Sequence, residues 1–275
     1  MRIRIITLIE NSPGEHLALK TEHGISFYIE KENHKILFDT GQSGAFIQNA
    51  HKLGINLEDI EMVAISHGHY DHSGGLRNFV DSVPPFELVV GKGFFNKKYA
   101  TDGISFEYLG NDFDEEYLKK QHISWRYAEK PTEEILPGIF ILTDFPRIHE
   151  DEKINSRFMI DTGNAFVPDD FSDEISLAVE TPRGFIVLVG CSHPGIKNML
   201  DAAVSRLPGP VYGVMGGTHL VEASEKSLAS SVHYLTTSGF KAIGVSHCTG
   251  DKGTTELQRS SKVFFRNTAG HALVI

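Results

Sequence analysis

The stretch Ser66-His67-Gly68-His69-Tyr70-Asp71-His72 decides the fold class of this chain. Its spacing, H-x-H-x-D-H, places four metal-binding side chains within six residues. Imidazole and carboxylate groups are ligands of zinc, iron and manganese, and pairs of such ions about 3.5–4 Å apart recur in hydrolytic enzymes. The run follows an apolar strand predicted at Met62–Ser66 and precedes Gly74-Gly75. This setting favours a metal site at the end of a strand over a solvated, histidine-rich surface turn.

Regular structure extends on both sides of this run. Apolar periodicity and turn residues predict strands over Arg4–Ile9, Ile25–Glu30, Lys35–Asp39, Glu87–Gly91, Glu174–Glu180, Phe185–Val189, Val211–Met215 and Ala242–Ser246. Helices are predicted over Ser43–Leu53, Leu76–Val83 (stopped by Pro84-Pro85), Ile196–Ser205 and Ser224–Ser238. The pattern weakens from about Gly93 to Phe171, which we interpret as an insertion or lid.

Histidines follow four of the predicted strands directly. These strand ends read Ile65-Ser66-His67, Val189-Gly190-Cys191-Ser192-His193, Met215-Gly216-Gly217-Thr218-His219 and Val245-Ser246-His247. The two halves of the chain thus share one order of elements, in which a strand leads into a loop that carries a histidine. This shared order predicts two similar layers packed face to face. We expect a single α/β domain over residues 1–275, with the four strand ends converging on one rim.

Composition limits the possible functions. Hydrophobic residues make up 40% of the chain and charged residues 23%, which is ordinary for a globular protein. The formal net charge of −10 argues against nucleic-acid binding through the overall field but leaves room for a local basic pocket. Net charge does not identify a substrate; the partner we expect is a small molecule. Two cysteines are too few for a disulfide scaffold, and we predict no membrane segment and no export signal. The expected location is the cytoplasm; the sequence does not indicate an oligomeric state.

The run His67 to His72 resembles the signature of the metallo-β-lactamase superfamily. Leu37-Phe38-Asp39-Thr40-Gly41 is similar to that family's strand and turn beneath the metal site. More closely, four other segments resemble one branch, which includes archaeal dihydropterin ribofuranosylaminobenzene 5′-phosphate synthases and many bacterial members without an assigned activity. These segments are Glu22-His23-Gly24-Ile25-Ser26, Gly190 to Ile196, Gly216-Gly217-Thr218-His219-Leu220 and Ser246 to Gly250. The resemblance implies a four-layer αββα sandwich with the inserted lid-like segment.

The resemblance also implies two divalent metal ions, with zinc expected and iron or manganese as alternatives. In the superfamily pattern, one ion is bound by residues matching His67, His69 and His193. The other is bound by residues matching Asp71, His72 and His247. Most members place a bridging aspartate where this chain has Cys191. Its thiolate could bind metal, or the thiol could be a small apolar filler, the commoner role of a buried cysteine.

Other candidate residues surround these ligands. We predict that Asp71 holds the nucleophile besides binding metal. For His219 and His23 two roles stay open: proton transfer with substrate contact, or a hydrogen-bonded structural role. Glu22 and Arg147 are further candidates for substrate contact. For Asp39 we expect a hydrogen bond that orients a ligand histidine, since ligating imidazoles usually donate their other N–H to an oxygen. The other histidines are expected at the surface or in structural roles: His16, His34, His51, His122, His149, His233 and His271.

Three functions remain open at the level of sequence. The first is a metal-dependent hydrolase that attacks a small, anionic or phosphorylated substrate with a metal-bound hydroxide. The second, implied by the branch, is a transferase that joins a pterin-methyl diphosphate to a ribofuranosylaminobenzene phosphate and releases pyrophosphate. The third is a non-catalytic protein that binds a metal or ligand.

Overall fold

The structure is a computed structural model that describes residues 3–15, 18–82 and 85–275. His16 lies outside the described residues, as do Val83 and Pro84, where we expected a helix to end. The chain forms two compact units. Unit 1 consists of Met1–Glu129, Asn155–Asp173 and Thr268–Ile275; unit 2 consists of Lys130–Ile154 and Glu174–Asn267. A single domain over residues 1–275 stays a prediction.

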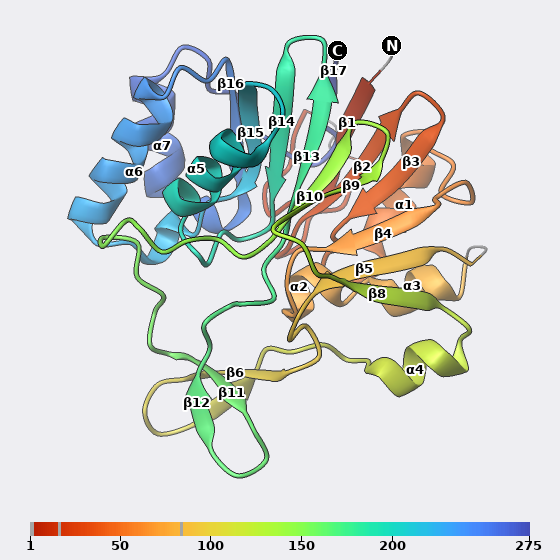
Figure 1. The fold of residues 1–275 in the computed structure, drawn as a ribbon. Coiled ribbons are helices and arrows are strands. Elements are labelled where there is room, and N and C mark those ends of the chain that lie inside the picture. The colour runs from red at the N-terminus through yellow and green to blue at the C-terminus, as the bar shows by residue number, and fades with distance from the viewer. Residues whose placement is uncertain (1–2, 16–17, 83–84) are drawn as a thin grey trace. The chain divides into compact units, whose positions relative to one another are not determined.

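Unit 1 is built on a seven-stranded sheet with the order β17-β1-β2-β3-β4-β5-β8 (Figure 1). Strands β3, β4, β5 and β8 run parallel, whereas β17, β1, β2 and β3 pair antiparallel. The strands are β1 (Ile3–Ile9), β2 (Ser26–Lys31), β3 (His34–Phe38), β4 (Met62–Ile65), β5 (Glu87–Gly91), β8 (Ser124–Ala128) and β17 (Ala272–Val274). The helices are α1 (Ala45–Lys52), α2 (Tyr70–Ser73), α3 (Leu76–Val80) and α4 (Glu115–Lys120).

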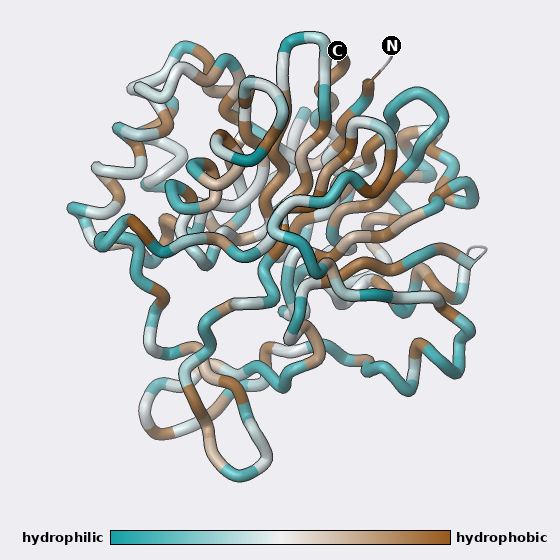
Figure 2. Tube along the Cα trace, viewed as in Figure 1, coloured by the Kyte–Doolittle hydropathy of each residue, from teal (hydrophilic) through white to brown (hydrophobic). Residues whose placement is uncertain are grey.

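The core of unit 1 lies between this sheet and its helices. Helix α1 buries Ala45, Phe46 and Ala50 on one face, the spacing of an amphipathic helix. Phe46 packs against Phe79 of α3 with ring centroids 5.8 Å apart. Central strand β4 is buried along its whole length and carries only apolar residues, as expected for a parallel strand covered on both faces. In Figure 2 much of the chain in the sheets is brown, which marks hydrophobic residues, whereas many loops are teal, which marks hydrophilic residues.

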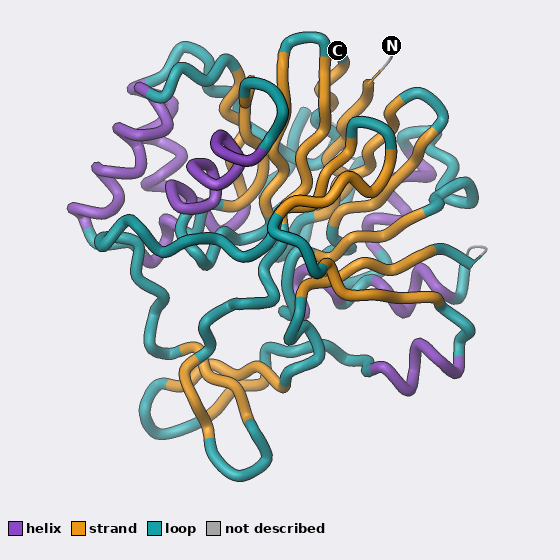
Figure 3. The backbone as a smooth tube through the Cα atoms, viewed as in Figure 1, coloured by secondary structure: helices purple, strands orange, loops and turns teal. Residues whose placement is uncertain are grey.

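A second, four-stranded sheet belongs to unit 1 and has the order β12-β11-β6-β7. Its strands are β6 (Lys97–Thr101), β7 (Phe106–Tyr108), β11 (Phe158–Asp161) and β12 (Phe166–Pro168). The rings of Phe106 and Phe166, from the edge strands β7 and β12, stack with centroids 3.8 Å apart. Figure 3 shows this small sheet as a separate group of strands. Its action as a lid stays a prediction.

Unit 2 contains a six-stranded sheet with the order β16-β15-β14-β13-β10-β9. Strands β13 and β14 form an antiparallel hairpin, and β14, β15 and β16 run parallel. Apolar faces of α5, α6 and α7 pack on the sheet in one core cluster. The strands are β9 (Thr132–Leu136), β10 (Ile139–Leu142), β13 (Ser176–Thr181), β14 (Gly184–Val189), β15 (Val211–Gly217) and β16 (Ala242–Ser246). The helices are α5 (Ile196–Arg206), α6 (Glu225–Thr237) and α7 (Gly250–Ser260), with short 3₁₀ turns η1 (Leu220–Glu222) and η2 (His247–Thr249).

The segment from 93 to 171 contains more than an insertion. Besides the small sheet, it supplies β8 to the large sheet of unit 1 and the pair β9 and β10 to the sheet of unit 2. Strand β9 is only half-buried and carries Glu133 and Glu134 at an edge, so its sequence lacks a strong apolar signal. The boundaries of the irregular segment therefore differ from those expected from periodicity.

None of the helices among the described residues is long and apolar enough to cross a membrane.

We predict that replacing Phe46 with alanine lowers the free energy of unfolding of unit 1 by about 3–5 kcal/mol, because it leaves a cavity in a fully buried aromatic cluster. The chain's one tryptophan, Trp125, packs against the same core, so its fluorescence during urea unfolding reports on this unit. Ile104→Ala is the matched control, since Ile104 is 93% exposed, and should change stability by less than about 0.5 kcal/mol. Equal unfolding midpoints for the two variants would contradict the assigned core.

Candidate metal centre

The four donors of the H-x-H-x-D-H run lie in one buried turn of unit 1. Strand β4 ends at Ile65, and the chain turns through His67 and His69 into the short helix α2, which carries Asp71 and His72. All four side chains are buried. The ring centroid of His67 lies 4.6 Å from that of His69 and 4.3 Å from that of His72. The turn therefore groups three imidazoles and a carboxylate, as the sequence predicted.

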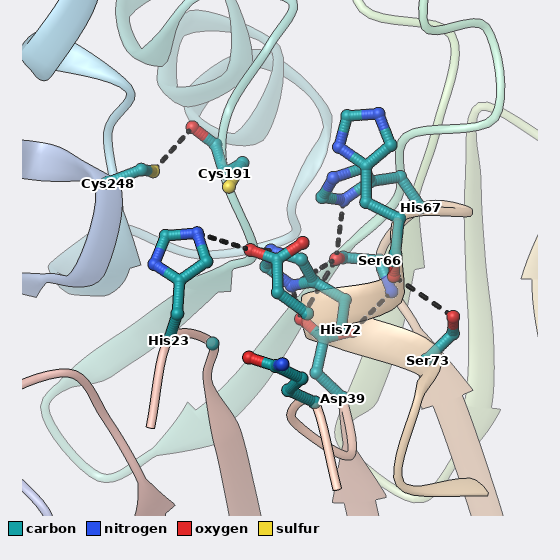
Figure 4. Close-up of polar contacts among 12 residues, drawn as sticks. His23, Asp39, Ser66, His67, His72, Ser73, Cys191 and Cys248 are labelled. Carbon is teal, nitrogen blue, oxygen red and sulfur yellow. Dashed lines mark hydrogen bonds and ion pairs between the residues drawn. The ribbon is translucent and has the colours of Figure 1, made fainter. Parts of the chain in front are cut away.

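Asp39 organises this turn from beneath (Figure 4). It follows β3 and is fully buried, with a left-handed backbone (φ 60°) that is uncommon for a residue other than glycine. Its Oδ1 accepts the backbone N–H of Ser66 at 2.6 Å, and its Oδ2 accepts the Ser66 hydroxyl at 2.9 Å. The same Oδ2 accepts Nδ1–H of His72 at 2.7 Å. One carboxylate thus fixes both the strand end and a predicted ligand.

These bonds determine the tautomers of two histidines. A carboxylate only accepts hydrogen bonds, so Nδ1 of His72 carries the proton. The single hydroxyl proton of Ser66 goes to Asp39, so Oγ must accept from Nδ1 of His67, which lies 3.0 Å away. In its neutral form each ring therefore presents an unprotonated Nε2, the form that binds a metal ion. The buried nitrogen and oxygen donors fit a divalent cation.

His23 approaches Asp71 from the preceding loop, as Figure 4 shows for the His23 side chain. Its Nε2 lies 3.3 Å from Oδ2 of Asp71, and its side chain is 53% exposed. Asn11 fixes the other side of the ring. The Asn11 Oδ1 accepts the N–H of Gly24 at 3.2 Å, so its Nδ2 faces Nδ1 of His23 at 3.2 Å and donates to it. The proton of His23 therefore sits on Nε2, directed at Asp71.

Gly24 is required for this approach. Its φ is +136°, and a Cβ atom at this position would lie 2.3 Å from the carbonyl oxygen of Asp71. The neighbouring Glu22, which we expected to contact substrate, forms hydrogen bonds within the protein. Its Oε1 accepts the N–H groups of Gln42 and Ser43, each at 3.0 Å, and its Oε2 accepts the Ser43 hydroxyl at 2.6 Å. Glu22 thus holds the turn before α1, and its contact with substrate stays a prediction.

Unit 2 gathers the remaining candidates at one edge of its sheet. Cys191 and His193 follow β14, His219 follows β15 and His247 follows β16. Because these three parallel strands are neighbours, their C-terminal ends meet at the same edge. The rings of His193 and His219 have centroids 4.3 Å apart. The sulfur of Cys191 lies within 4.8 Å of a ring nitrogen of His193 and of one of His247. Within unit 2 the predicted convergence of strand ends is confirmed.

The loops of unit 2 are held by buried groups with unusual backbone geometry. Glu174 is buried, and its carboxylate accepts the N–H of Ser192 at 2.8 Å and that of His193 at 3.2 Å. The N–H of His219 points at the sulfur of Cys248 at 3.2 Å, and that thiol donates to the carbonyl of Cys191 at 3.5 Å. Left-handed backbone recurs at Ser192, His219 and His247, and such strain is commonly concentrated at functional sites.

The structure brings most of the predicted site residues together in clusters, and it also contains supporting residues that the sequence did not indicate. The structure groups all six predicted metal ligands within two clusters, one in each unit, and places His23 on Asp71 and His219 beside His193. The side chain of Arg147 is exposed, and its role in substrate binding stays a prediction. Sequence reasoning missed the residues that hold the ligand loops. They are Asn11, Lys98, Asp173, Glu174 and Cys248.

The metallo-β-lactamase superfamily model matches residues 21–211 of this chain. This range includes the H-x-H-x-D-H run, its supporting Asp39 and the strand end at His193. The chain therefore belongs to the metallo-β-lactamase superfamily, and it has the metallo-β-lactamase fold, as predicted.

Comparison with individual relatives shows which branch of the superfamily this chain resembles. A 7,8-dihydropterin-6-methyl-4-(β-D-ribofuranosyl)-aminobenzene-5′-phosphate synthase of Methanocaldococcus jannaschii is 33% identical over 96% of this chain and 93% of its own length. An uncharacterised protein of the same organism is 31% identical over 86% of this chain and 88% of its own. Among solved structures, a metal-dependent hydrolase of the beta-lactamase superfamily is 29% identical, covers 99% of both chains and has a TM-score of 0.86. The predicted branch resemblance is confirmed.

We predict that Asp39→Asn lowers the affinity for Zn²⁺ by about 10- to 100-fold, because an amide has one acceptor oxygen. Its NH₂ group would face either the N–H of Ser66 or the donors from the Ser66 hydroxyl and His72. Isothermal titration calorimetry of the metal-free protein checks this value. The exposed Asp59 provides the control variant Asp59→Asn, which should bind as the wild type does. Unchanged affinity in Asp39→Asn, with the native thermal transition retained, would remove Asp39 from the site.

Proposed function

We propose that this chain is a metal-dependent hydrolase that acts on a small, anionic or phosphorylated substrate. The observation that carries the proposal is the hydrogen bonding of Asp39 and Ser66, which leaves His67 and His72 with Nε2 ready to bind metal. A merely structural histidine cluster does not require this choice of tautomer. Membership of the metallo-β-lactamase superfamily supports the same function.

Two divalent cations, zinc in the first instance, complete the proposed centre. His67, His69 and His193 would hold one ion, and Asp71, His72 and His247 the other. We add Cys191 as a further donor, because its sulfur lies within 4.8 Å of a ring nitrogen of His193 and of one of His247. Its thiolate would take the place of the aspartate common in the superfamily, and a thiolate favours zinc and iron over harder cations such as Mg²⁺.

The chain's own residues orient the reactants and move protons. When bound, the cations would polarise the substrate and lower the pKa of a water molecule. Asp71 is held by His23, so its second oxygen can orient that water toward phosphorus or a carbonyl carbon. As the new O–P or O–C bond forms, the bond to the leaving oxygen breaks. His219 or the half-exposed His23 would take up the proton that the water releases and then, as an imidazolium, give a proton to that leaving oxygen.

Substrate binding is assigned to residues around this centre. His23 and His219 are the proposed contacts nearest the ligands, and Glu22 and the exposed Arg147 are further candidates. A guanidinium group pairs well with a phosphate or carboxylate. The cytoplasm stays the proposed location.

A second candidate function is transfer, favoured by one specific observation. The synthase of M. jannaschii is 33% identical over nearly the full length of both chains. In such a reaction the amino nitrogen of the aromatic compound replaces water as the nucleophile, and the proton that it loses would pass to His219 or His23. A new bond forms to the pterin-methyl carbon, and pyrophosphate leaves with the electron pair of the broken C–O bond. The proposed cations would then bind the diphosphate. A non-catalytic binding role is the third choice, and the buried, pre-oriented ligands argue against it.

The two reactions are distinguished by their need for an acceptor. We expect the zinc-loaded protein to release phosphate, pyrophosphate or an alcohol from phosphorylated pterins and simple phosphodiesters without any aromatic amine. Product is followed by phosphate or pyrophosphate detection. Treatment with EDTA, and the double variant His67→Ala/His69→Ala, should lower the rate at least about 100-fold. The exposed His51 supplies the control His51→Ala, with an unchanged rate.

Pyrophosphate release that requires an aminobenzene acceptor would establish transfer instead of hydrolysis. Turnover that persists in the double variant after its metal is lost would contradict both.

A further inference from the structure

Two consecutive acidic residues, Asp173 and Glu174, each hold the backbone of one ligand loop. Asp173 is the last residue of a segment of unit 1, and Glu174 is the first residue of a segment of unit 2. Their side chains are buried, with residue exposures of 2% and 1%. Buried carboxylates are costly unless they are fully hydrogen-bonded, so their partners indicate what they do.

In unit 1, Asp173 fixes the turn between two predicted ligands. Its Oδ2 accepts the N–H of Gly68 at 2.8 Å, and Gly68 lies between His67 and His69. Its Oδ1 accepts from the ammonium group of Lys98 at 2.8 Å, and that group also donates to Asp169 at 2.6 Å. Burial lowers the pKa of Lys98, but the carboxylates of Asp173 and Asp169 outweigh burial and raise it. Lys98 therefore stays charged and offsets part of the negative charge of the two buried carboxylates.

The same segment also packs on the ligand rings. Phe171 has a left-handed backbone (φ 50°), which turns its ring toward the site. The centroid of this ring lies 5.3 Å from that of His69 and 6.0 Å from that of His67. Phe158 of β11 lies 5.6 Å from His69 on the same measure. Gly91, at the end of β5, allows the approach, since a Cβ there would lie 2.0 Å from the carbonyl oxygen of Asp173.

In unit 2, Glu174 performs the corresponding task. Its two oxygens accept the N–H groups of Ser192 and His193, on the turn that carries His193 itself. Ser192 has a left-handed backbone (φ 61°), and its hydroxyl donates to the carbonyl of Gly217 at 2.7 Å. The carboxylate therefore holds a strained turn in place.

We propose that Asp173 and Glu174, with Lys98 as counter-ion, are positioning residues that set the conformation of the two ligand loops. The inference rests on the proposed function, since it treats His67, His69 and His193 as ligands. Neither carboxylate touches the reacting atoms. Each acts through backbone N–H groups next to a ligand, so its loss should loosen the loop and weaken metal binding without removing a donor.

The isosteric variants Asp173→Asn and Glu174→Gln test this proposal. Each replaces one acceptor oxygen with an NH₂ group that faces either an N–H group or the Lys98 ammonium, and so disrupts the clamp while preserving volume. We expect the Kd for Co²⁺ to rise about 10- to 100-fold in each, with an altered visible absorption spectrum of the bound Co²⁺. Asp170→Asn and Glu180→Gln are the controls, since both residues are exposed on the same two segments, and they should match the wild type.

A second measurement needs no variant. In the metal-free wild-type protein, the amides of Gly68, Ser192 and His193 should exchange with solvent at least about 100-fold more slowly than in an unstructured peptide. Fast exchange at these three amides would overturn the proposal even if a variant failed to fold. If the wild type binds Co²⁺ and both variants bind it equally well with the same spectrum, the positioning role is wrong and the proposed function stands. If the wild type binds no Co²⁺, the proposed function itself fails.

Discussion

The hydrogen bonds of the buried Asp39 carboxylate are the constraint on which the candidate metal centre depends. Its two oxygens accept from the backbone and hydroxyl of Ser66 and from Nδ1 of His72. The end of β4, the start of the H-x-H-x-D-H turn and the tautomers of two histidines follow from these three bonds. A buried carboxylate tolerates such an environment only when its acceptors are used, so the charge and the geometry of the turn are coupled.

The same principle recurs at the other loops of the site. Asp173 holds Gly68, Glu174 holds Ser192 and His193, and Glu22 holds the turn that begins at Gln42. In each case a carboxylate accepts hydrogen bonds from backbone N–H groups that have no partner within a strand or a helix. The candidate site residues therefore sit on irregular backbone, but that backbone is fixed by charge-assisted hydrogen bonds.

Sequence alone predicted much of this arrangement. Apolar periodicity identified the principal strands, since β4, β14, β15 and β16 are short, apolar and bounded by turns. The spacing of His67 to His72 identified four candidate ligands, because residues this close in the sequence stay together in one turn of the structure. It could not identify Asp173 or Glu174, whose partners are 105 and 18 residues away in the sequence. Edge strand β9 and helix α7 were missed because their exposed, polar residues weaken the periodic signal.

The central claim is that the turn at His67 to His72 is built to bind metal. Elemental analysis of protein purified without added metal tests this claim most directly. We expect close to two equivalents of a transition metal per chain, falling to about one or fewer in His67→Ala/His69→Ala, which lacks two of the three histidines proposed to hold one ion. A folded wild-type protein that contains no metal, and takes up none on dialysis against Zn²⁺, would contradict it.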